Sequence, residues 1–371
     1  MNFRYEMPTS IYFGRNVIRD NADVFHRAGK KALLVTGQSS AKKNGSLQDI
    51  IWSLEKKGVT YVLFDEVEEN PSLETIERGA TIGSRENADF IIGIGGGSPM
   101  DAAKAIAVFI QNPSVTKETI FKQGSLSALP VIAVATTAGT GSEVTPYSIV
   151  TVNAEKTKKN LGQRVFPVAA FLDSKYTEAL PVDITVNTAV DAFTHLVEGY
   201  LNTNSNQMSD LYAEEGFALF ASCFPKLLQQ QFDASFREAV LYASMLAGMV
   251  IAQTGTSLPH GMGYALTYHK GLSHGAANGI LTSEYLKIFK NQTKLERMLS
   301  LLKLESIQKL EEILKRLMPV KVLITEQEIE AYASAFLANK AKRKNHPEEI
   351  GLEEILQIYK NSLLGFRSFS I

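Results

Sequence analysis

Cysteine is nearly absent from this chain, because Cys223 is the only one among 371 residues. One cysteine excludes an internal disulfide and any metal site built from several thiolates, and it is typical of a reducing compartment. Charge of one sign is lacking as well, since 38 Lys and Arg residues stand against 39 Asp and Glu residues. This balance gives no reason to expect nucleic acid or a membrane as a partner, so a small molecule is the expected ligand.

Long apolar runs are also missing. The most apolar segment, residues 241–252, is shorter than the roughly 20 residues that span a bilayer, and we expect a core helix there. The N-terminus lacks a basic region followed by an apolar core, so it predicts an early strand rather than a signal peptide, and the protein is expected in the cytoplasm.

The first half of the chain alternates short apolar runs with helical patterns. Strands are predicted at residues 31–36, 60–65, 90–94 and 130–137, with helices near 46–57, 72–86 and 99–111. Strands this apolar fit a parallel sheet that is covered on both faces. After Pro181 the strand signals stop, and amphipathic helical patterns at 285–317 and 326–360 follow, with residues 340–349 expected to be a solvated helix end and loop. We predict an α/β domain over residues 1–180, a helical domain over 181–371, and a ligand between them.

A run of three glycines separates the strand at 90–94 from the next helix. Ser98 is expected to be the N-cap of that helix, Pro99 its first residue, and Asp101 the partner in a capping box. Glycines before a helix N-terminus allow a phosphate to approach free backbone N–H groups. The alternative is a tight turn without a ligand, and the strict G-x-G-x-x-G pattern is not met because Ser98 stands at its last position.

Histidines provide the second signal. Asp191 and His195 are four residues apart on a predicted helix, so they share one face. His260 and His274 are fourteen apart, a rise of about 21 Å on a straight helix, so the chain must reverse if both bind one ion. Gly261, Gly263 and Gly271 offer places for that reversal. Three imidazoles and a carboxylate suit Fe²⁺, Zn²⁺, Co²⁺ or Ni²⁺. His269 is expected to lie in a cleft or behind the ligands at best, and His26 and His346 at the surface.

Five motifs carry a resemblance to a known family: GIGGGSPMDAAKAIA (93–107), ATTAGTGSEVT (135–145), DAFTH (191–195), SLPHGMGYAL (257–266) and LSHGAANGI (272–280). As a set they resemble the iron-containing alcohol dehydrogenases, and weaker similarity at 69–72 and 345–356 extends over nearly the whole chain. The resemblance implies a Rossmann-like dinucleotide-binding α/β domain followed by an all-helical metal-binding domain, the dehydroquinate synthase-like fold, and a homodimer. It implies that the metal ligands are Asp191, His195, His260 and His274.

The resemblance also implies that the glycine loop holds the cofactor pyrophosphate, and that a lysine before the FP dipeptide contacts the ribose. Lys158 and Lys159 compete for that place, and Lys159 is favoured. NAD-preferring members carry an Asp after the first sheet strand, where this chain has Gly37, so NADP is favoured, with a turn that accepts both cofactors as the alternative. The residues expected at the cofactor are Gly37, Ser39, Ser40, Lys42, Asn70, Gly95, Gly96, Gly97, Ser98, Asp101, Thr136, Thr137, Thr140, Ser142 and Lys159.

The function predicted is a metal-dependent, NAD(P)-linked oxidoreductase that interconverts small primary alcohols or diols and aldehydes by hydride transfer, with Fe²⁺ favoured and Zn²⁺ as the alternative. No side chain is an evident dedicated base, and Tyr264 stands where some members carry a further histidine. Two alternatives are kept: a metal- and NAD-dependent cyclising lyase of the dehydroquinate synthase type, and a non-catalytic nucleotide-binding sensor. The lyase would need several basic residues near the metal, whereas residues 186–201 and 257–280 offer only Lys270.

Overall fold

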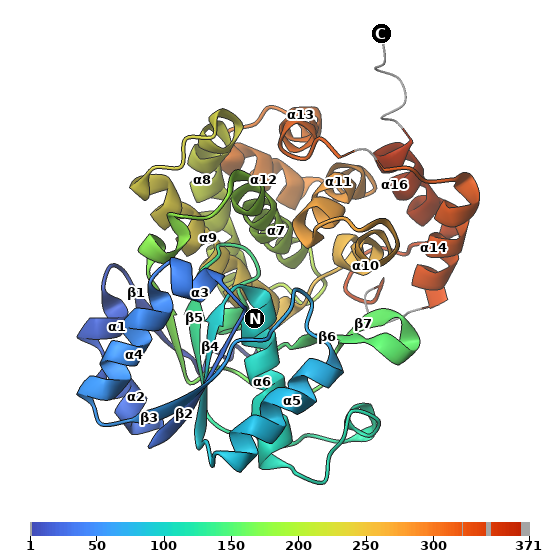
Figure 1. The fold of residues 1–371 in the computed structure, drawn as a ribbon. Helices are drawn as coiled ribbons and strands as arrows, with labels where there is room; N and C mark the ends of the chain where they lie inside the picture. The colour runs from blue at the N-terminus through green and yellow to red at the C-terminus, as the bar shows by residue number, and fades with distance from the viewer. Residues whose placement is uncertain (1, 321, 339–342, 365–371) are drawn as a thin grey trace. The chain divides into compact units, whose positions relative to one another are not determined.

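The computed structural model describes residues 2–320, 322–338 and 343–364. The chain divides into two compact units between Leu180 and Pro181. Residues 7–180 form the first, called here the α/β unit, and residues 2–6 join the described residues from 181 onward in the second, the helical unit (Figure 1). The N-terminal segment is tied to the helical unit by Glu6, whose N–H and carbonyl oxygen both bond to the side chain of Gln253.

The α/β unit is built on one parallel sheet. Its strands lie in the order β1 (Ser10–Phe13), β8 (Ala169–Leu172), β5 (Val131–Ala135), β4 (Phe90–Gly95), β2 (Lys31–Thr36) and β3 (Thr60–Phe64). Every pairing between neighbours is parallel, and the strands expected from the apolar runs are present. The Rossmann-like prediction for this half is confirmed.

Both faces of the sheet are buried because alternate residues of each strand point to opposite sides. Leu33 and Val35 of β2 join the core on one side, whereas Ala32 and Leu34 join the core on the other. The first side is covered by α5 (Leu73–Arg85) and α6 (Gly97–Gln111), and the second by α1 (Val17–Asp20), α2 (Asp23–Ala28) and α4 (Ser46–Lys56) (Figure 1). The short α3 (Ser40–Lys43) follows β2.

A two-stranded antiparallel hairpin, β6 (Ile149–Val152) and β7 (Thr157–Asn160), was not expected from the sequence. The reason is that β7 reads TKKN, which is polar and at most half-buried, so it lacks the apolar pattern of a strand. Pairing with β6 in the fold overrides that weak local preference.

The helical unit is all-α among its described residues, as predicted. Its helices are α7 (Val182–Tyr200), α8 (Gln207–Gln229), α9 (Ala234–Thr254), α10 (Leu258–Lys270), α11 (His274–Lys287), α12 (Thr293–Leu302), α13 (Ile307–Leu317), α14 (Glu326–Ala338) and α16 (Leu352–Leu363). Helix α9 is long and apolar enough to cross a membrane by length and composition, yet most of it is buried inside the fold. This burial confirms the core helix predicted at 241–252.

The amphipathic patterns at 285–317 and 326–360 fall on several helices, with a turn between α12 and α13 and a loop before α16. One detail of the C-terminal prediction needs correction. His346 is buried rather than at the surface, and its ring meets Tyr285 and Phe289 edge-on at 5.7 and 4.6 Å between centroids. Part of the predicted solvated loop, residues 340–342, lies outside the described residues.

Candidate metal centre and cofactor loop

Helix α7 presents two of the predicted ligands from one face. Asp191 and His195 are both buried, at 3% and 5% exposure, which is unusual for a carboxylate and an imidazole four residues apart on a helix. His260, in the first turn of α10, joins them, and one ligand atom from each of the three side chains lies within 4.8 Å of the others. The rings of His195 and His260 stack at 4.4 Å. Three of the four residues predicted from spacing are thus brought together.

The fourth predicted ligand, His274, lies beside this group at the first residue of α11. Its Nε2 is 3.8 Å from Asp191 Oδ1, and its ring is 5.1 Å from that of His260. Asn278, one turn along α11, reaches both neighbours, since its Nδ2 lies 3.2 Å from Asp191 Oδ1 and 3.3 Å from His274 Nε2. Asn278 is fully buried and was missed by the sequence reasoning, although its spacing of four from His274 was available as a signal.

Glycines allow these helices to approach. A Cβ at Gly275 would lie 1.9 Å from the carbonyl oxygen of Asn187 on α7, and a Cβ at Gly263 would lie 2.3 Å from Asn278 Oδ1. The expected chain reversal between the later histidines occurs at Gly271 alone, which has a φ of 67° and ends α10. Gly261 and Gly263 lie inside α10 instead, so their predicted role in the reversal is wrong.

The electrostatics of the site favour the charged forms of its acid and base. Burial raises the pKa of Asp191, but His195, His274 and His260 outweigh it and hold that pKa well below its ordinary value. Burial lowers the pKa of His260, but Glu198 and Asp191 outweigh it and raise that pKa to about 9. Without a metal, Asp191 is therefore ionised and His260 protonated, and a bound cation takes the place of the proton on the His260 ring.

These residues fit a divalent metal ion. His260 Nε2 is buried, makes no hydrogen bond to the described residues and lies 3.6 Å from Asp191 Oδ1. Asp191 and Glu198 place two carboxylates in the interior, and no Lys or Arg among the described residues forms an ion pair with either. Two buried carboxylates beside His260 carry more negative charge than one imidazole can compensate, and imidazole nitrogen with carboxylate oxygen is a donor set that Fe²⁺ and Zn²⁺ accept.

In the α/β unit, two of the three glycines, Gly96 and Gly97, lie in tight contact with the loop after β5, and Gly95 lies against Pro99. Gly95 has a φ of 152°, a Cβ at Gly96 would lie 3.0 Å from Thr137 Oγ1, and a Cβ at Gly97 would lie 2.8 Å from Thr140 Cγ2. Helix α6 begins at Gly97 with Gly96 as its N-cap.

The predicted capping box is therefore wrong, because Ser98 and Asp101 already lie inside α6. Ser98 Oγ accepts the backbone N–H of Asn70 at 3.0 Å, so it fastens a neighbouring loop instead. Asp101 accepts from Ser142 Oγ at 2.6 Å and from the N–H of Ile149 at 2.9 Å. Both residues hold loops around the start of α6 rather than capping it.

The order of the strands supports a nucleotide site at their carboxyl ends. The chain runs from β2 to β3 on one side, then returns to β4 on the other, so β2 and β4 flank a topological switch point. Ligands of open α/β sheets bind at such points. Gly37, Ser39, Ser40 and Lys42 follow β2, the glycine loop follows β4, and Thr136 and Thr137 follow β5. Lys42 Nζ is paired with Asp65 Oδ2 at 2.5 Å, an acid that follows β3.

The two candidate lysines of β7 point to different partners. Lys158 Nζ donates to Asn70 Oδ1 at 2.7 Å, and Asn70 is the residue whose N–H meets Ser98. Lys159 pairs with Glu155 and lies over the ring of Phe121. Lys158, the competing candidate, therefore contacts another residue predicted at the cofactor, whereas the favoured Lys159 is engaged elsewhere.

A buried charge network beneath this loop was not foreseen. Lys104 of α6 is fully buried, and its Nζ donates to the carbonyl oxygens of Ser142 and Tyr147 and to Ser142 Oγ at 2.7 to 2.8 Å. Burial lowers the pKa of Lys104 to about 8, while Asp101 and Glu143 oppose that shift. The spacing of three between Asp101 and Lys104 was the available signal.

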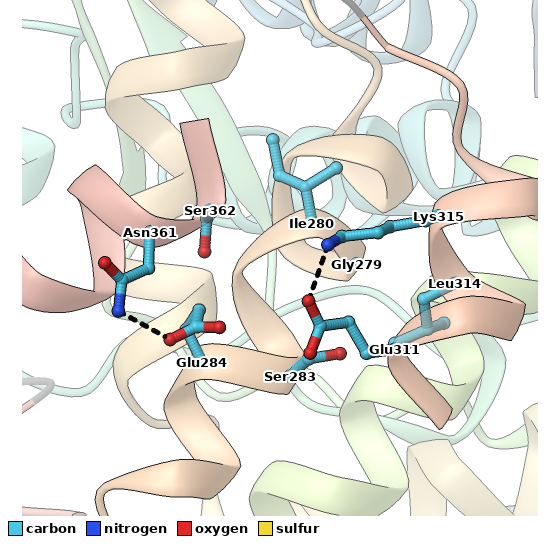
Figure 2. A pocket seen from close by; sticks show the side chains of 9 residues that line it. All are labelled: Gly279, Ile280, Ser283, Glu284, Glu311, Leu314, Lys315, Asn361 and Ser362. Atoms are coloured by element: carbon cyan, nitrogen blue, oxygen red, sulfur yellow. Dashed lines mark hydrogen bonds and ion pairs between the residues drawn. The ribbon is translucent and has the colours of Figure 1, made fainter. Parts of the chain in front are cut away.

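Two aromatic contacts and one small cavity also lie in the helical unit. Tyr264 lies with its ring 5.9 Å from that of His274, whereas His269 stacks on Tyr332 at 5.2 Å, outside the ligand group. Figure 2 shows the side chains that line a cavity between α11, α13 and α16. The cavity has a volume of about 20 Å³, which is room for one water. Its polar walls include Glu284, which accepts from Asn361, and none of the predicted ligands lines it.

Comparison with known proteins agrees with this geometry. The family model of iron-containing alcohol dehydrogenase matches residues 8–174, and that of the C-terminal part of the Fe-containing alcohol dehydrogenase family matches residues 185–363. The NADPH-dependent butanol dehydrogenase of Clostridium saccharobutylicum is 32% identical, over 79% of this chain and 76% of the relative. The 1,3-propanediol dehydrogenase of Klebsiella pneumoniae is 32% identical, over 75% and 73%.

A solved structure of an iron-containing alcohol dehydrogenase from Thermotoga maritima superposes with a TM-score of 0.90 at 38% identity, covering 98% of this chain and 99% of that one. Both halves of the chain therefore match the same family in sequence and in fold. The chain belongs to the iron-containing alcohol dehydrogenase family, and it is a metal-dependent oxidoreductase of alcohols and aldehydes.

Proposed function

We propose that Asp191, His195, His260 and His274 hold one divalent cation, Fe²⁺ in preference to Zn²⁺, and that the α/β unit binds NADP in preference to NAD. The observation that carries this proposal is the convergence of Asp191, His195 and His260 in a buried site where His260 Nε2 has no hydrogen-bond partner among the described residues. His274 is included because its Nε2 lies 3.8 Å from Asp191 Oδ1, within the adjustment that binding an ion requires.

When bound, the cation supplies Lewis acidity toward an alcohol or aldehyde oxygen, and the nicotinamide accepts or gives the hydride. The chain's own residues position the cation and form a buried, charged site from which water is largely excluded. Asp191, His195 and His260 are nearly inaccessible to water, and the absence of a side chain at Gly275 and Gly263 lets α7, α10 and α11 lie close together. Tyr264, beside His274, replaces a histidine that some members have, so the proton is proposed to leave through water and the ribose hydroxyls.

The preference for NADP rests on the region after β2. Gly37 brings no carboxylate there, and the exposed Ser39 and Ser40 can donate hydrogen bonds to a 2′-phosphate. Lys42 carries positive charge at the same edge, but Asp65 compensates part of it. The butanol dehydrogenase relative is named as NADPH-dependent, which supports the same choice.

The substrates proposed are small primary alcohols, diols and their aldehydes, since the relatives are named for butanol and 1,3-propanediol. We further propose that the protein is a cytoplasmic homodimer with the two domains 1–180 and 181–371. The lyase alternative is disfavoured because Lys270, the one basic residue in the ligand-bearing stretches, is paired with Glu328 at 2.7 Å.

The test is an anaerobic assay of nicotinamide absorbance with NADPH or NADH and a panel of short aldehydes. Metal-free protein and protein loaded with Fe²⁺ or Zn²⁺ are compared, together with His260→Ala. We expect turnover only with metal, faster with NADPH, and none in the variant. Turnover without metal, or no turnover with any aldehyde, contradicts the metal-dependent function, and equal use of both cofactors contradicts the preference for NADP.

A further inference from the structure

Glu198 lies on the same face of α7 as two proposed ligands, seven residues after Asp191 and three after His195. Its side chain has no exposed surface, and it is not a member of the group of close ligand atoms around Asp191. No Lys or Arg among the described residues forms an ion pair with it. A buried carboxylate is stable as an anion only if a partner compensates its charge.

Both oxygens of Glu198 bind the start of α10. Oε1 is bonded to Nδ1 of His260, and Oε2 accepts the backbone N–H of Ser257 at 2.6 Å and more weakly that of His260 at 3.4 Å. Ser257 is the N-cap residue of α10, and its own side chain makes no capping bond. One carboxylate from α7 therefore replaces the missing cap of α10 and also grips the imidazole in its first turn.

The bond to Nδ1 decides how the imidazole is used. An ionised carboxylate only accepts, so in the neutral ring, which is the form that binds a metal, the proton lies on Nδ1 and the lone pair of His260 lies on Nε2. Nε2 is the atom that lies 3.6 Å from Asp191 Oδ1. A carboxylate behind a ligating histidine fixes its tautomer and makes it a stronger donor.

Resting on the proposed function, we propose that Glu198 is a positioning residue: it holds His260 in the tautomer and orientation in which Nε2 faces the metal. A cap for α10 alone would need only Oε2. The hydrogen bond between Oε1 and Nδ1 of His260 is the observation that distinguishes a positioning role from a capping role.

The first test measures metal affinity. Metal-free protein is titrated with Co²⁺, and binding is followed by the visible absorption of the ion in wild type, Glu198→Gln and Glu284→Gln. Glu284 is the matched control, because it is a buried carboxylate of α11 whose partners are Asn361 and Lys287. We expect Co²⁺ binding to weaken by about 10- to 100-fold in Glu198→Gln and to stay unchanged in the control. A folded Glu198→Gln protein with wild-type affinity overturns the proposal.

The second test needs no variant. In wild-type protein loaded with Zn²⁺ and labelled with nitrogen-15 in histidine, NMR should show the proton of His260 on Nδ1 and the metal on Nε2. A proton on Nε2 overturns the role of Glu198, while the proposed function stands. Failure of wild-type protein to bind Co²⁺ or Zn²⁺ at all overturns the proposed function instead, so the two failures are distinguishable.

Discussion

Glu143 shows how one buried acid ties stability to pH at the scale of a residue. It is 1% exposed, and its Oε1 has no hydrogen-bond partner among the described residues. Burial raises its pKa from 4.5 to about 7, against the lowering effects of a backbone hydrogen bond and Lys104. The folded protein therefore binds more protons than the unfolded chain between these pH values, so stability falls as pH rises through that window.

We predict that Glu143→Gln removes this slope and stabilises the α/β unit above pH 7 by on the order of 3 kcal/mol. The single tryptophan, Trp52, lies on α4, so its fluorescence reports unfolding of this unit. Urea midpoints measured by that signal between pH 4.5 and 7 check the prediction. The exposed Glu69→Gln is the control and should keep the wild-type slope; a slope retained in Glu143→Gln would contradict the assignment.

Lys158 and Lys159 give a second prediction at this scale. Lys158 adjoins Asn70 and, through it, Ser98, whereas Lys159 is engaged by Glu155 and Phe121. A lost hydrogen bond from a charged donor costs about 1.5–3 kcal/mol, so Lys158→Ala should raise the KM for NADPH roughly tenfold or more. Lys159→Ala should leave it within about twofold, the size of a surface contact. Steady-state kinetics with NADPH measure both values. A larger rise in KM for Lys159→Ala than for Lys158→Ala would contradict this prediction and favour Lys159 as the lysine at the cofactor.

At the scale of secondary-structure elements, the close contact between α7 and α11 depends on a glycine. Gly275 lies where α11 meets α7, next to two proposed ligands, and a Cβ there would be 1.9 Å from the carbonyl oxygen of Asn187. A backbone atom cannot turn aside as a side chain can, so Gly275→Ala must separate the helices. We predict a loss of at least about 3 kcal/mol in stability together with loss of bound metal. Circular dichroism melts and metal analysis of the purified variant measure both.

Gly271→Ala is the matched control. Gly271 has a φ of 67°, and a Cβ at this position would meet nothing within 4 Å, so the change adds backbone strain without a clash. It should cost about 1 kcal/mol and keep the metal. If Gly275→Ala retains metal as fully as Gly271→Ala, the close contact of α7 and α11 is not what assembles the site.

The same elements show what the sequence could predict. The apolar strands, and the change from strands to helices after Pro181, can be recognised from the local pattern of apolar residues. The sheet of the α/β unit and the helical second half were therefore predicted correctly. Asp191 and His195 were predicted as neighbouring ligands because a spacing of four residues, which places two side chains on one helix face, can be read directly from the sequence. The start of α6 was misplaced because three glycines let the helix begin before the expected cap, held by contacts to Thr137 and Thr140.

Partners remote in sequence remained hidden. Glu198 meets His260 across 62 positions, and Lys104 meets Ser142 across 38, so neither pairing leaves a local pattern. The burial of His346 depends on Tyr285 and Phe289 of another segment and contradicts what its charged neighbours suggest. Such contacts are set by packing, which single-sequence periodicity does not describe.

For the whole molecule, the family membership predicts a homodimer. Light scattering behind size-exclusion chromatography should give twice the mass of one chain, with and without metal. The edge strand β1 has a partner on one side only among the described strands, β8, which leaves its other side able to pair with a second copy. A mass equal to one chain at micromolar concentration would contradict this prediction.

Each unit buries apolar residues of its own, so the metal and the cofactor should stabilise different parts of the molecule. A ligand at a concentration 100 times its Kd adds about 2.7 kcal/mol to the unit that binds it. Removing metal with a chelator should therefore lower the melting transition of the helical unit, seen by circular dichroism, and leave the Trp52 fluorescence transition of the α/β unit in place. Adding NADPH should raise the Trp52 transition in metal-free protein. Equal shifts of both signals by either treatment would show that the units unfold as one cooperative body and would contradict the prediction that each bound group stabilises only its own unit.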